Sequence, residues 1–232
     1  MVFRANHQVS ETAIDSVTAY AFDAYGTLFD VHAAMAAHRP AMGPDAAAFS
    51  ALWRAKQLEY TWTRTLMGRY CDFWTLTGEA LDFALAAYPA VPASLRQPLL
   101  DVYFALPAFA DARAALERLS AAGARAVIFT NGTEPMAARA AASAGLTDLI
   151  EGIVSVDGLG RYKTVPETYA LVHERLGCAP GTVALVSSNR WDIAGAAAAG
   201  MPGIWVNRSG AADEYADLAP VRTVRSLDDI GR

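Results

Sequence analysis

Residues 19–30 of the chain read AYAFDAYGTLFD. The segment 17–22 is apolar, with β-branched and aromatic side chains that favour a buried strand, and Asp23 follows its last residue directly. A carboxylate at the carboxyl end of a strand, just before the tight turn indicated by a Gly-Thr pair, lies where α/β sheets bind their ligands. Position 25 is Tyr rather than a second Asp, and this absence limits the chemistry that Asp23 can perform.

Strand-like and helix-like segments alternate along most of the chain. Further strands are predicted at 125–130, 152–156, 183–187 and 203–206. Helices are predicted at 108–122, 134–144, 168–176 and 191–199, and glycine follows each of them, as it commonly does after a helix C-terminus. Short strands joined by such helices predict an α/β fold with a doubly wound, Rossmann-like parallel sheet, whose ligands bind at the carboxyl ends of the strands.

One segment, 32–107, interrupts this alternation because it contains no convincing strand. Three helices are predicted there: one from an N-cap at Asp45 to Met67, one over 72–87 and one over 92–104. Helices inserted directly after the first strand would form a cap that closes over the strand ends and excludes water. We therefore expect a core domain of 17–31 and 108–232, a helical cap of 32–107 and a flexible N-terminal leader of 1–16.

Composition points to a globular protein of enzyme size. The 232 residues are 53% hydrophobic and 19% charged, and the formal net charge of −5 gives no support for nucleic-acid or anionic-membrane binding. No apolar run approaches the roughly 18 residues of a membrane span, and the leader lacks the apolar stretch of a signal peptide. Two distant cysteines, Cys71 and Cys178, argue against a disulfide framework or a metal site. We expect a cytoplasmic protein.

Each of the main strands is followed by a loop that carries polar or reactive side chains. After 125–130 comes Asn131-Gly132-Thr133, and after 183–187 comes the run SNRWD at 188–192. A single lysine, Lys163, precedes the helix predicted at 168–176. Because parallel strands deliver their loops to one edge of a sheet, we expect a carboxylate, a hydroxyl, an ammonium and a second carboxylate to meet in one crevice.

These loops resemble those of the haloacid dehalogenase superfamily, and more narrowly its L-2-haloacid dehalogenase (type II) branch. The narrower resemblance rests on FDAYGTLFDVH at 22–32, LWRAKQLEYTWTRTLMGRYCDFW at 52–74 and VSSNRWDIAGA at 186–196, and it covers roughly residues 19–208. Two positions depart from the family pattern. Thr130 stands where serine is commoner, and Thr164 follows Lys163 where proline is commoner. Both departures leave the functional groups in place.

The residues and the resemblance agree on Asp23 as a nucleophile. Phosphatases of the superfamily use a second Asp two residues later as acid and base, and they hold Mg²⁺ against the nucleophile. Tyr25 stands in that position and does neither job at neutral pH, which favours metal-free displacement at carbon over phosphoryl transfer. Lys163 would keep the Asp23 carboxylate ionised by charge pairing. The side chains expected to orient this carboxylate belong to Thr27, Ser187 and Asn189.

The remaining site residues are assigned by chemistry and by the resemblance. Arg54, with the Asn131 amide, would bind the displaced halide, since a guanidinium is weakly hydrated and suits a buried anion. The substrate carboxylate would bind the Thr130 hydroxyl and the backbone N–H groups after Asp23. Asp192, supported by Lys163 and Asn189, would position or activate the hydrolytic water. Apolar walls are expected from Tyr25, Leu58, Phe73 and Trp191, and Tyr169 would brace the site.

The resemblance implies hydrolysis of short-chain (S)-2-haloalkanoic acids to (R)-2-hydroxy acids, with inversion, through an ester on Asp23. It implies no cofactor and no metal, and it implies a homodimer that forms through the cap. Three alternatives stay open at this point. They are a Mg²⁺-dependent phosphatase, a related hydrolase that displaces another C2 leaving group such as an azetidine carboxylate ring nitrogen, and a non-catalytic binding protein.

Overall fold

The computed structural model describes residue 14, residues 16–179 and residues 181–231. Six parallel strands form one sheet in the order β3-β2-β1-β4-β5-β6. Their bounds are Ala19–Phe22 (β1), Arg125–Thr130 (β2), Gly152–Ser155 (β3), Val183–Ser187 (β4), Gly203–Val206 (β5) and Arg222–Val224 (β6). The predicted doubly wound parallel sheet is confirmed, and β6 extends it by a strand that was not predicted. Residues 1–13 and 15 of the predicted leader lie outside the described residues.

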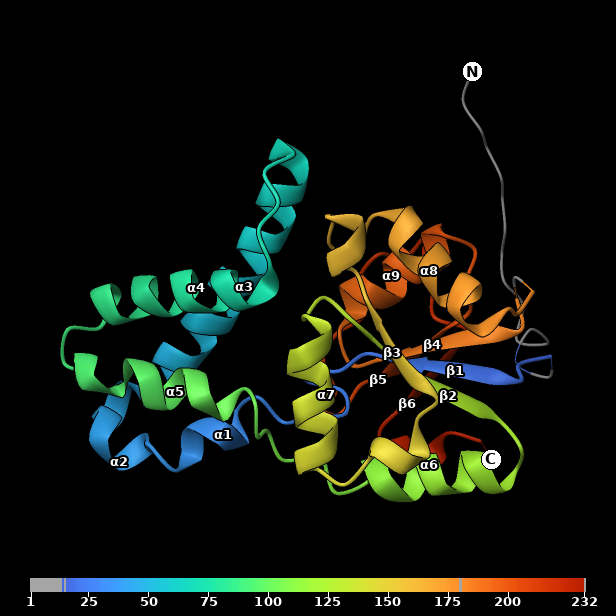
Figure 1. The fold of residues 1–232 in the computed structure, drawn as a ribbon, viewed down its shortest axis with the longest axis horizontal. Helices are drawn as coiled ribbons and strands as arrows, with labels where there is room; N and C mark the ends of the chain where they lie inside the picture. The colour runs from blue at the N-terminus through green and yellow to red at the C-terminus, as the bar shows by residue number, and fades with distance from the viewer. Residues whose placement is uncertain (1–13, 15, 180, 232) are drawn as a thin grey trace.

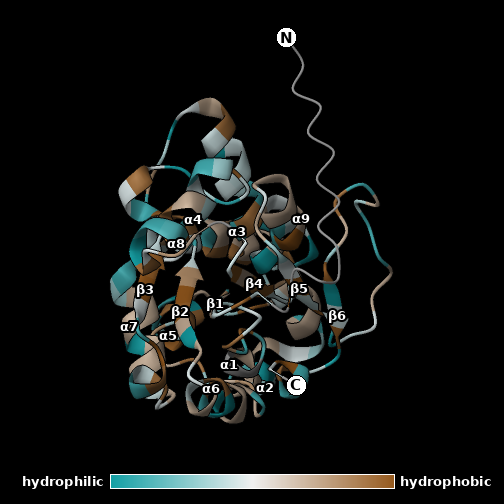
Figure 2. Ribbon diagram, turned by 90° about the vertical axis from the view of Figure 1, so that its right-hand side faces the viewer, coloured by the Kyte–Doolittle hydropathy of each residue, from teal (hydrophilic) through white to brown (hydrophobic). Residues whose placement is uncertain are grey.

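Four helices cover the two faces of this sheet. They are Ala112–Ala121 (α6), Glu134–Ser143 (α7), Pro166–Leu176 (α8) and Arg190–Ala198 (α9). Figure 2 shows α8 and α9 on one side of the strands and α6 on the other. The predicted start of α6 at residue 108 is wrong by four residues, because Ala108 forms a bridge with Phe29 and the Phe109 N–H donates to the carbonyl of Leu28.

The register of the central strands sets the position of Asp23. β1 lies between β2 and β4, with Phe22 opposite Ile128 on one side and Val186 on the other. Every residue of β1 and β4 is buried, as expected for strands covered by helices on both faces. Asp23 is therefore the first residue after the central strand β1, at the carboxyl edge of the sheet. Its N–H donates there to the Val186 carbonyl.

A separate lobe of helices lies beyond this edge of the sheet (Figure 1). Its helices are Ala33–Ala36 (α1), Arg39–Met42 (α2), Ala46–Met67 (α3), Phe73–Ala87 (α4) and Arg96–Val102 (α5). The two connections to the lobe run side by side, since the Asp30 N–H donates to the Pro107 carbonyl at 2.9 Å next to the Phe29–Ala108 bridge. The division into core and cap at residues 31/32 and 107/108 stays a prediction, which these paired connections support.

In the helical lobe, local sequence signals predicted some helix starts correctly and others not. Asp72 caps α4, since its carboxylate accepts from the Thr75 N–H at 3.0 Å. Asp45 precedes α3 as predicted, but its side chain makes no capping bond because the residue ends a 3₁₀ turn, Gly43–Asp45. The third predicted helix, 92–104, divides into a 3₁₀ turn at Ala93–Leu95 and the shorter α5. Across the described ranges, no helix has the length and apolar character needed to cross a bilayer.

Candidate active site

The loop after β1 is folded so that Thr27 returns to Asp23. The Ala24 carbonyl accepts the N–H groups of Leu28 and Phe29, which closes a tight turn. Gly26 lies within it at a φ of +95°, a conformation that costs glycine little and side-chain-bearing residues much more. The Thr27 hydroxyl consequently donates to Oδ2 of Asp23 at 3.0 Å, and it accepts the Ser188 N–H at 2.9 Å.

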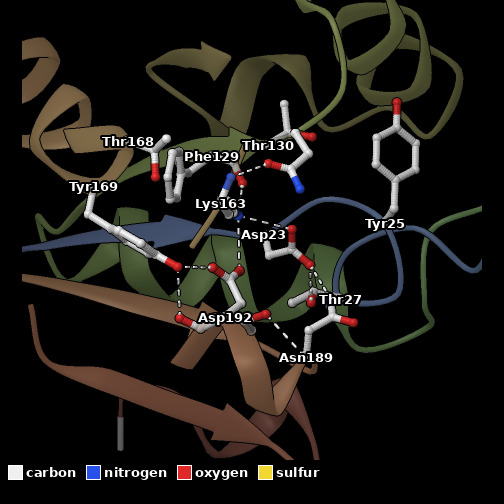
Figure 3. Close-up of polar contacts among 12 residues, drawn as sticks. Asp23, Tyr25, Thr27, Phe129, Thr130, Lys163, Thr168, Tyr169, Asn189 and Asp192 are labelled. Carbon is white, nitrogen blue, oxygen red and sulfur yellow. Dashed lines mark hydrogen bonds and ion pairs between the residues drawn. The ribbon is translucent and has the colours of Figure 1, made fainter. Parts of the chain in front are cut away.

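Three donors from three loops hold the Asp23 carboxylate (Figure 3). Thr27 and the Asn189 amide, the latter at 2.8 Å, both donate to Oδ2, while the Lys163 ammonium lies 3.2 Å from Oδ1. Asp23 is itself buried. An acceptor-only carboxylate surrounded by donors of this kind suits a fixed anion, because hydrogen bonds from charged and neutral donors stabilise the ionised form. The loops that carry Thr27, Lys163 and Asn189 therefore meet at Asp23, as predicted.

Lys163 is the centre of the polar network. Its side chain has no exposed surface, and its ammonium donates to Asp23, to Oδ2 of Asp192 at 2.9 Å and to the Phe129 carbonyl at 2.9 Å. A lysine ammonium has three donors, and all three are used. Its backbone is fixed as well, since the Lys163 N–H donates to Oδ1 of Asn131 at 2.9 Å. Asp23 and Asp192 thus share one buried cation. The Phe129 carbonyl is a partner that residue-type reasoning did not anticipate.

Asp192 is fully buried and has a partner on each oxygen. Besides the Lys163 bond on Oδ2, the Tyr169 hydroxyl donates to Oδ1 at 2.9 Å. Burial raises the pKa of Asp192 and the charge of Asp23 raises it further, while Lys163 and Tyr169 oppose this shift. Burial and the nearby Asp192 also raise the pKa of Tyr169 well above its usual value, so its hydroxyl stays a donor. These contacts orient Lys163, and the predicted action of Asp192 on a water stays a prediction.

Arg54 connects the helical lobe to the nucleophile loop. From α3, its Nη2 donates to the Tyr25 carbonyl at 3.3 Å. The Tyr25 ring stacks on Phe73 of α4 at 5.8 Å and lies 5.9 Å from the ring of Tyr103. Burial raises the pKa of Tyr25 far above its usual range, and its hydroxyl points away from the Asp23 carboxylate (Figure 3). Tyr25 therefore packs among aromatic rings of the helical lobe, and its expected role as an apolar wall of the site stays a prediction. Tyr103, the residue that follows α5, makes this contact although it was not among the predicted site residues.

Other predicted site residues have local partners in this structure. The Ser187 hydroxyl accepts the Asn189 N–H at 3.1 Å and so shapes the loop that carries Asn189. The Thr130 hydroxyl accepts the Gly132 N–H at 2.9 Å. Trp191 packs edge-on against Trp62 of α3, and Leu58 is partly buried on the same helix. The substrate and halide contacts assigned to these residues and to Asn131 stay predictions.

The donor set around Asp23 does not fit a magnesium ion. Mg²⁺ takes oxygen ligands, but Asp23 faces the NH₂ group of Asn189, the hydroxyl proton of Thr27 and the ammonium of Lys163. The carbonyl at position 25 accepts from Arg54. In the part of the chain that the structure describes, no group of three or more His, Cys, Asp and Glu side chains is arranged to hold a metal.

Comparisons with known proteins agree with this geometry. A model of haloacid dehalogenase-like hydrolases matches residues 17–200. The chain is 45% identical to (S)-2-haloacid dehalogenase 1 of Pseudomonas sp. strain CBS-3, over 90% of this chain and 92% of that protein. It is 42% identical to (S)-2-haloacid dehalogenase 4A of Burkholderia cepacia, over 94% of each chain.

Solved structures agree as well. The structure of L-2-haloacid dehalogenase from Xanthobacter autotrophicus with chloropropionic acid covalently bound matches with a TM-score of 0.84 and 36% identity, over 92% of this chain and 96% of that one. A second solved dehalogenase matches with a TM-score of 0.90 and 42% identity, over 92% and 95% of the two chains. On this evidence the chain belongs to the haloacid dehalogenase-like hydrolases, within the branch of the (S)-2-haloacid dehalogenases.

Proposed function

We propose that this protein hydrolyses short-chain (S)-2-haloalkanoic acids to (R)-2-hydroxy acids through an ester on Asp23. The observation that carries this proposal is the buried Asp23 carboxylate, held by Thr27, Lys163 and Asn189 beneath a helical lobe whose Arg54 reaches the same loop. A fixed and desolvated carboxylate with no metal ligand set around it is suited to attack carbon. The named relatives and the covalently bound chloropropionic acid in the Xanthobacter enzyme support the same reaction.

In the first step, a carboxylate oxygen of Asp23 forms a bond to C2 of the substrate, and the C2–halogen bond breaks with the electron pair leaving on the halide. Attack from the side opposite the halogen inverts C2. Arg54 presents donors to the departing anion, and Tyr25, Phe73 and Tyr103 supply an apolar, stacked wall that keeps water from C2. The substrate carboxylate is assigned to the Thr130 hydroxyl and to backbone N–H groups after Asp23.

In the second step, water attacks the side-chain carbonyl carbon of the Asp23 ester. The ester C–O bond on the carboxyl side breaks, so the 2-hydroxy acid keeps an oxygen that belonged to Asp23, and the water oxygen stays in the regenerated carboxylate. The attacking water gives one proton to a base near Asp23, and the departing alkoxide oxygen takes up a proton to become the hydroxyl group of the product. Asp192 is our candidate for this base, because it bonds to Lys163 beside the nucleophile and burial raises its pKa.

The test is turnover of (S)-2-chloropropionate in ¹⁸O-water with EDTA present. We expect chloride release, (R)-2-hydroxypropionate as product, and, in a single turnover, ¹⁸O in the Asp23 carboxylate rather than in the product. The (R)-substrate and the Asp23→Asn variant are the controls, and neither should release chloride. Label in the first product would contradict the ester route. Phosphate-ester hydrolysis that EDTA abolishes would instead support the phosphatase alternative, and absence of halide release from every 2-haloacid would refute the dehalogenase assignment.

We also propose that the protein is a cytoplasmic homodimer that assembles through its helical lobe. Leu66 and Met67, adjacent at the end of α3, are 87% and 63% exposed; exposed large apolar side chains of this kind favour a partner. Two free cysteines fit a reducing compartment. Sedimentation analysis should give a dimer that Leu66→Lys weakens, and cell fractionation should place the protein in the cytoplasm. A monomer at micromolar concentration would contradict the dimer.

A further inference from the structure

A buried chain of hydrogen bonds runs from Arg54 into the helical lobe. The Nη1 of Arg54 donates to Oε1 of Gln57 at 2.7 Å, and Nε2 of Gln57 donates to the Thr77 hydroxyl at 2.7 Å. Thr77 in turn donates to the Phe73 carbonyl at 2.7 Å. Gln57 and Thr77 have no exposed surface. The chain joins α3 to α4 and connects the guanidinium to the residue whose ring stacks on Tyr25.

We propose that Gln57 is a positioning residue that holds the Arg54 guanidinium in the orientation needed by the departing halide. This inference rests on the proposed dehalogenation. The role of Gln57 differs from that of Arg54, because Gln57 binds the guanidinium and acts on the halide only through it. A glutamine is unusual in a fully buried position of a helix, and burial without both hydrogen bonds would cost free energy.

The direction of each bond in the chain is determined by chemistry. A guanidinium only donates, so Gln57 must present its carbonyl oxygen to Arg54 and its NH₂ group to Thr77. The Phe73 carbonyl only accepts, so Thr77 must donate to it and accept from Gln57. These directions satisfy Gln57 and Thr77 together, and Gln57 also interacts with the Tyr103 hydroxyl, so the network restricts the rotamers of its members.

Arg54 is consequently held at two points. Its Nη1 is bound to Gln57 from the lobe, and its Nη2 is bound to the Tyr25 carbonyl from the nucleophile loop. A guanidinium carries its five N–H donors in one rigid plane, so bonds on both Nη atoms fix the orientation of that plane. Because the plane is fixed before the reaction, Arg54 loses no side-chain freedom while negative charge develops on the halogen. Donors that are already in place stabilise a developing charge most effectively.

The consequence depends on the leaving group. Chloride is a poorer leaving group than bromide, so displacement of chloride needs more stabilisation of the developing anion. Loss of Arg54 positioning should therefore slow the chloro substrate more than the bromo substrate, and it should weaken inhibition by free bromide. A merely structural role of Gln57 would lower the amount of active enzyme and change both substrates by the same factor.

The experiment compares Gln57→Met with the wild type on (S)-2-chloropropionate and (S)-2-bromopropionate. Met has nearly the same length but makes neither bond. We expect kcat/KM for the chloro acid to fall by about 10- to 100-fold, the range produced by small displacements of a positioning group, with a smaller fall for the bromo acid and a higher inhibition constant for bromide. The matched control is Gln97→Met, the same change at an exposed position of α5, which should leave all three quantities unchanged.

Gln57→Glu decides the question if the Met variant does not fold. It keeps an acceptor for Arg54 but has no donor for Thr77, and its carboxylate competes with the halide for the guanidinium, so bromide inhibition should weaken at neutral pH. Equal losses on both substrates with unchanged bromide inhibition would overturn the positioning role. A wild-type enzyme that releases no halide would refute the proposed function instead, so the two failures are distinguishable.

Discussion

The ammonium of Lys163 lies 3.2 Å from Oδ1 of Asp23, and the lysine side chain has no surface exposed to solvent. This contact joins residues 140 positions apart and makes the nucleophile part of a larger unit, because the same ammonium pairs with Asp192 at 2.9 Å. Two carboxylates around one buried cation are stable together only while the cation remains. The properties of Asp23 are therefore set by groups on two other loops.

Replacement of Lys163 by Met should abolish halide release and destabilise the fold. Asp23 and Asp192 would then face each other without a cation, and removal of one partner of a buried ion pair costs about 3–5 kcal/mol. We expect activity to fall by at least about 10³-fold, as for loss of a key electrostatic group, and the urea midpoint of unfolding to fall. Halide release and equilibrium unfolding measure the two effects.

The double variant Lys163→Met/Asp192→Asn separates the two effects. It removes the cation and one of the carboxylates, so part of the lost free energy of unfolding should return while activity stays absent. If the double variant were as unstable as Lys163→Met alone, the buried charge repulsion would not be the cause of the instability.

Tyr169→Phe should move the acid limb of the pH–kcat profile to higher pH. The Tyr169 hydroxyl donates to Asp192, and this bond lowers the pKa of that carboxyl against the raising effect of burial. Without the bond the pKa of Asp192 rises, so the carboxylate becomes protonated and releases Lys163 at a higher pH than in the wild type. Initial rates measured at constant ionic strength from about pH 4 to about pH 9 check this shift. This pH range includes the region of about pH 5–8 in which proteins are usually most stable.

Tyr88→Phe on the helical lobe is the matched control for this shift, since it deletes the same hydroxyl at a distance from Asp192. Its acid limb should coincide with that of the wild type. An acid limb of Tyr169→Phe that stays in place or moves to lower pH would show that ionisation of Asp192 does not limit the reaction.

Gly195→Ala should destabilise the protein through the same tyrosine. A Cβ at position 195 would overlap the Tyr169 hydroxyl and would lie 2.9 Å from Cβ of Thr164. Such overpacking costs about 1–3 kcal/mol and would displace the hydroxyl from Asp192, so both the free energy of unfolding and kcat should fall. The control is Gly158→Ala, where nothing lies within 4 Å of the added atom. Unchanged stability in Gly195→Ala would contradict the close packing of α8 against α9.

Asp111→Asn should reduce the free energy of unfolding in a pH-dependent way. Asp111 accepts bonds from Arg208, from the Ser226 hydroxyl and from the Leu227 N–H, and Arg208 also donates to the Thr27 carbonyl at 3.2 Å. Burial raises the pKa of Asp111, but these bonds outweigh it and leave the pKa lowered. The stabilisation is therefore present above the unfolded-state value near pH ~4 and disappears as the pH falls through the lower folded-state value.

At pH 7 we expect a loss of about 1.5–3 kcal/mol in Asp111→Asn, the range for hydrogen bonds to a charged group, and convergence with the wild type in strong acid. Urea unfolding at a series of pH values measures both. Asp82→Asn is the control, because the Asp82–Arg96 pair is at the surface with the carboxylate side chain 53% exposed, and such pairs contribute at most about 1 kcal/mol. Equal losses in the two variants would refute a special role for Asp111.

Short-range patterns were enough to predict most of the elements of this fold. The apolar strands, the glycines after the helices and the Asp72 cap depend on neighbours a few residues away, so β2, β4, β5 and α4 were predicted to within a residue or so. β6 was missed because Arg222–Val224 is three residues long and is a strand only through its pairing with β5. The predicted start of α6 was wrong because Ala108 pairs with Phe29. The sequence of the whole helical lobe lies between these two residues, so no local pattern indicates the contact.

The sequence by itself determined which chemical groups this protein brings to the carboxyl edge of its sheet, since residue type and strand position are local properties. Only the tertiary structure decided which of those groups touch. Asn189, rather than Ser187, donates to Asp23, and Lys163 donates to the Phe129 carbonyl besides the two carboxylates that it was expected to support. Arg54 is held by a glutamine whose role no motif indicates. These pairings depend on where distant loops and two lobes meet in space, and hydrogen bonds are made or lost over fractions of an ångström.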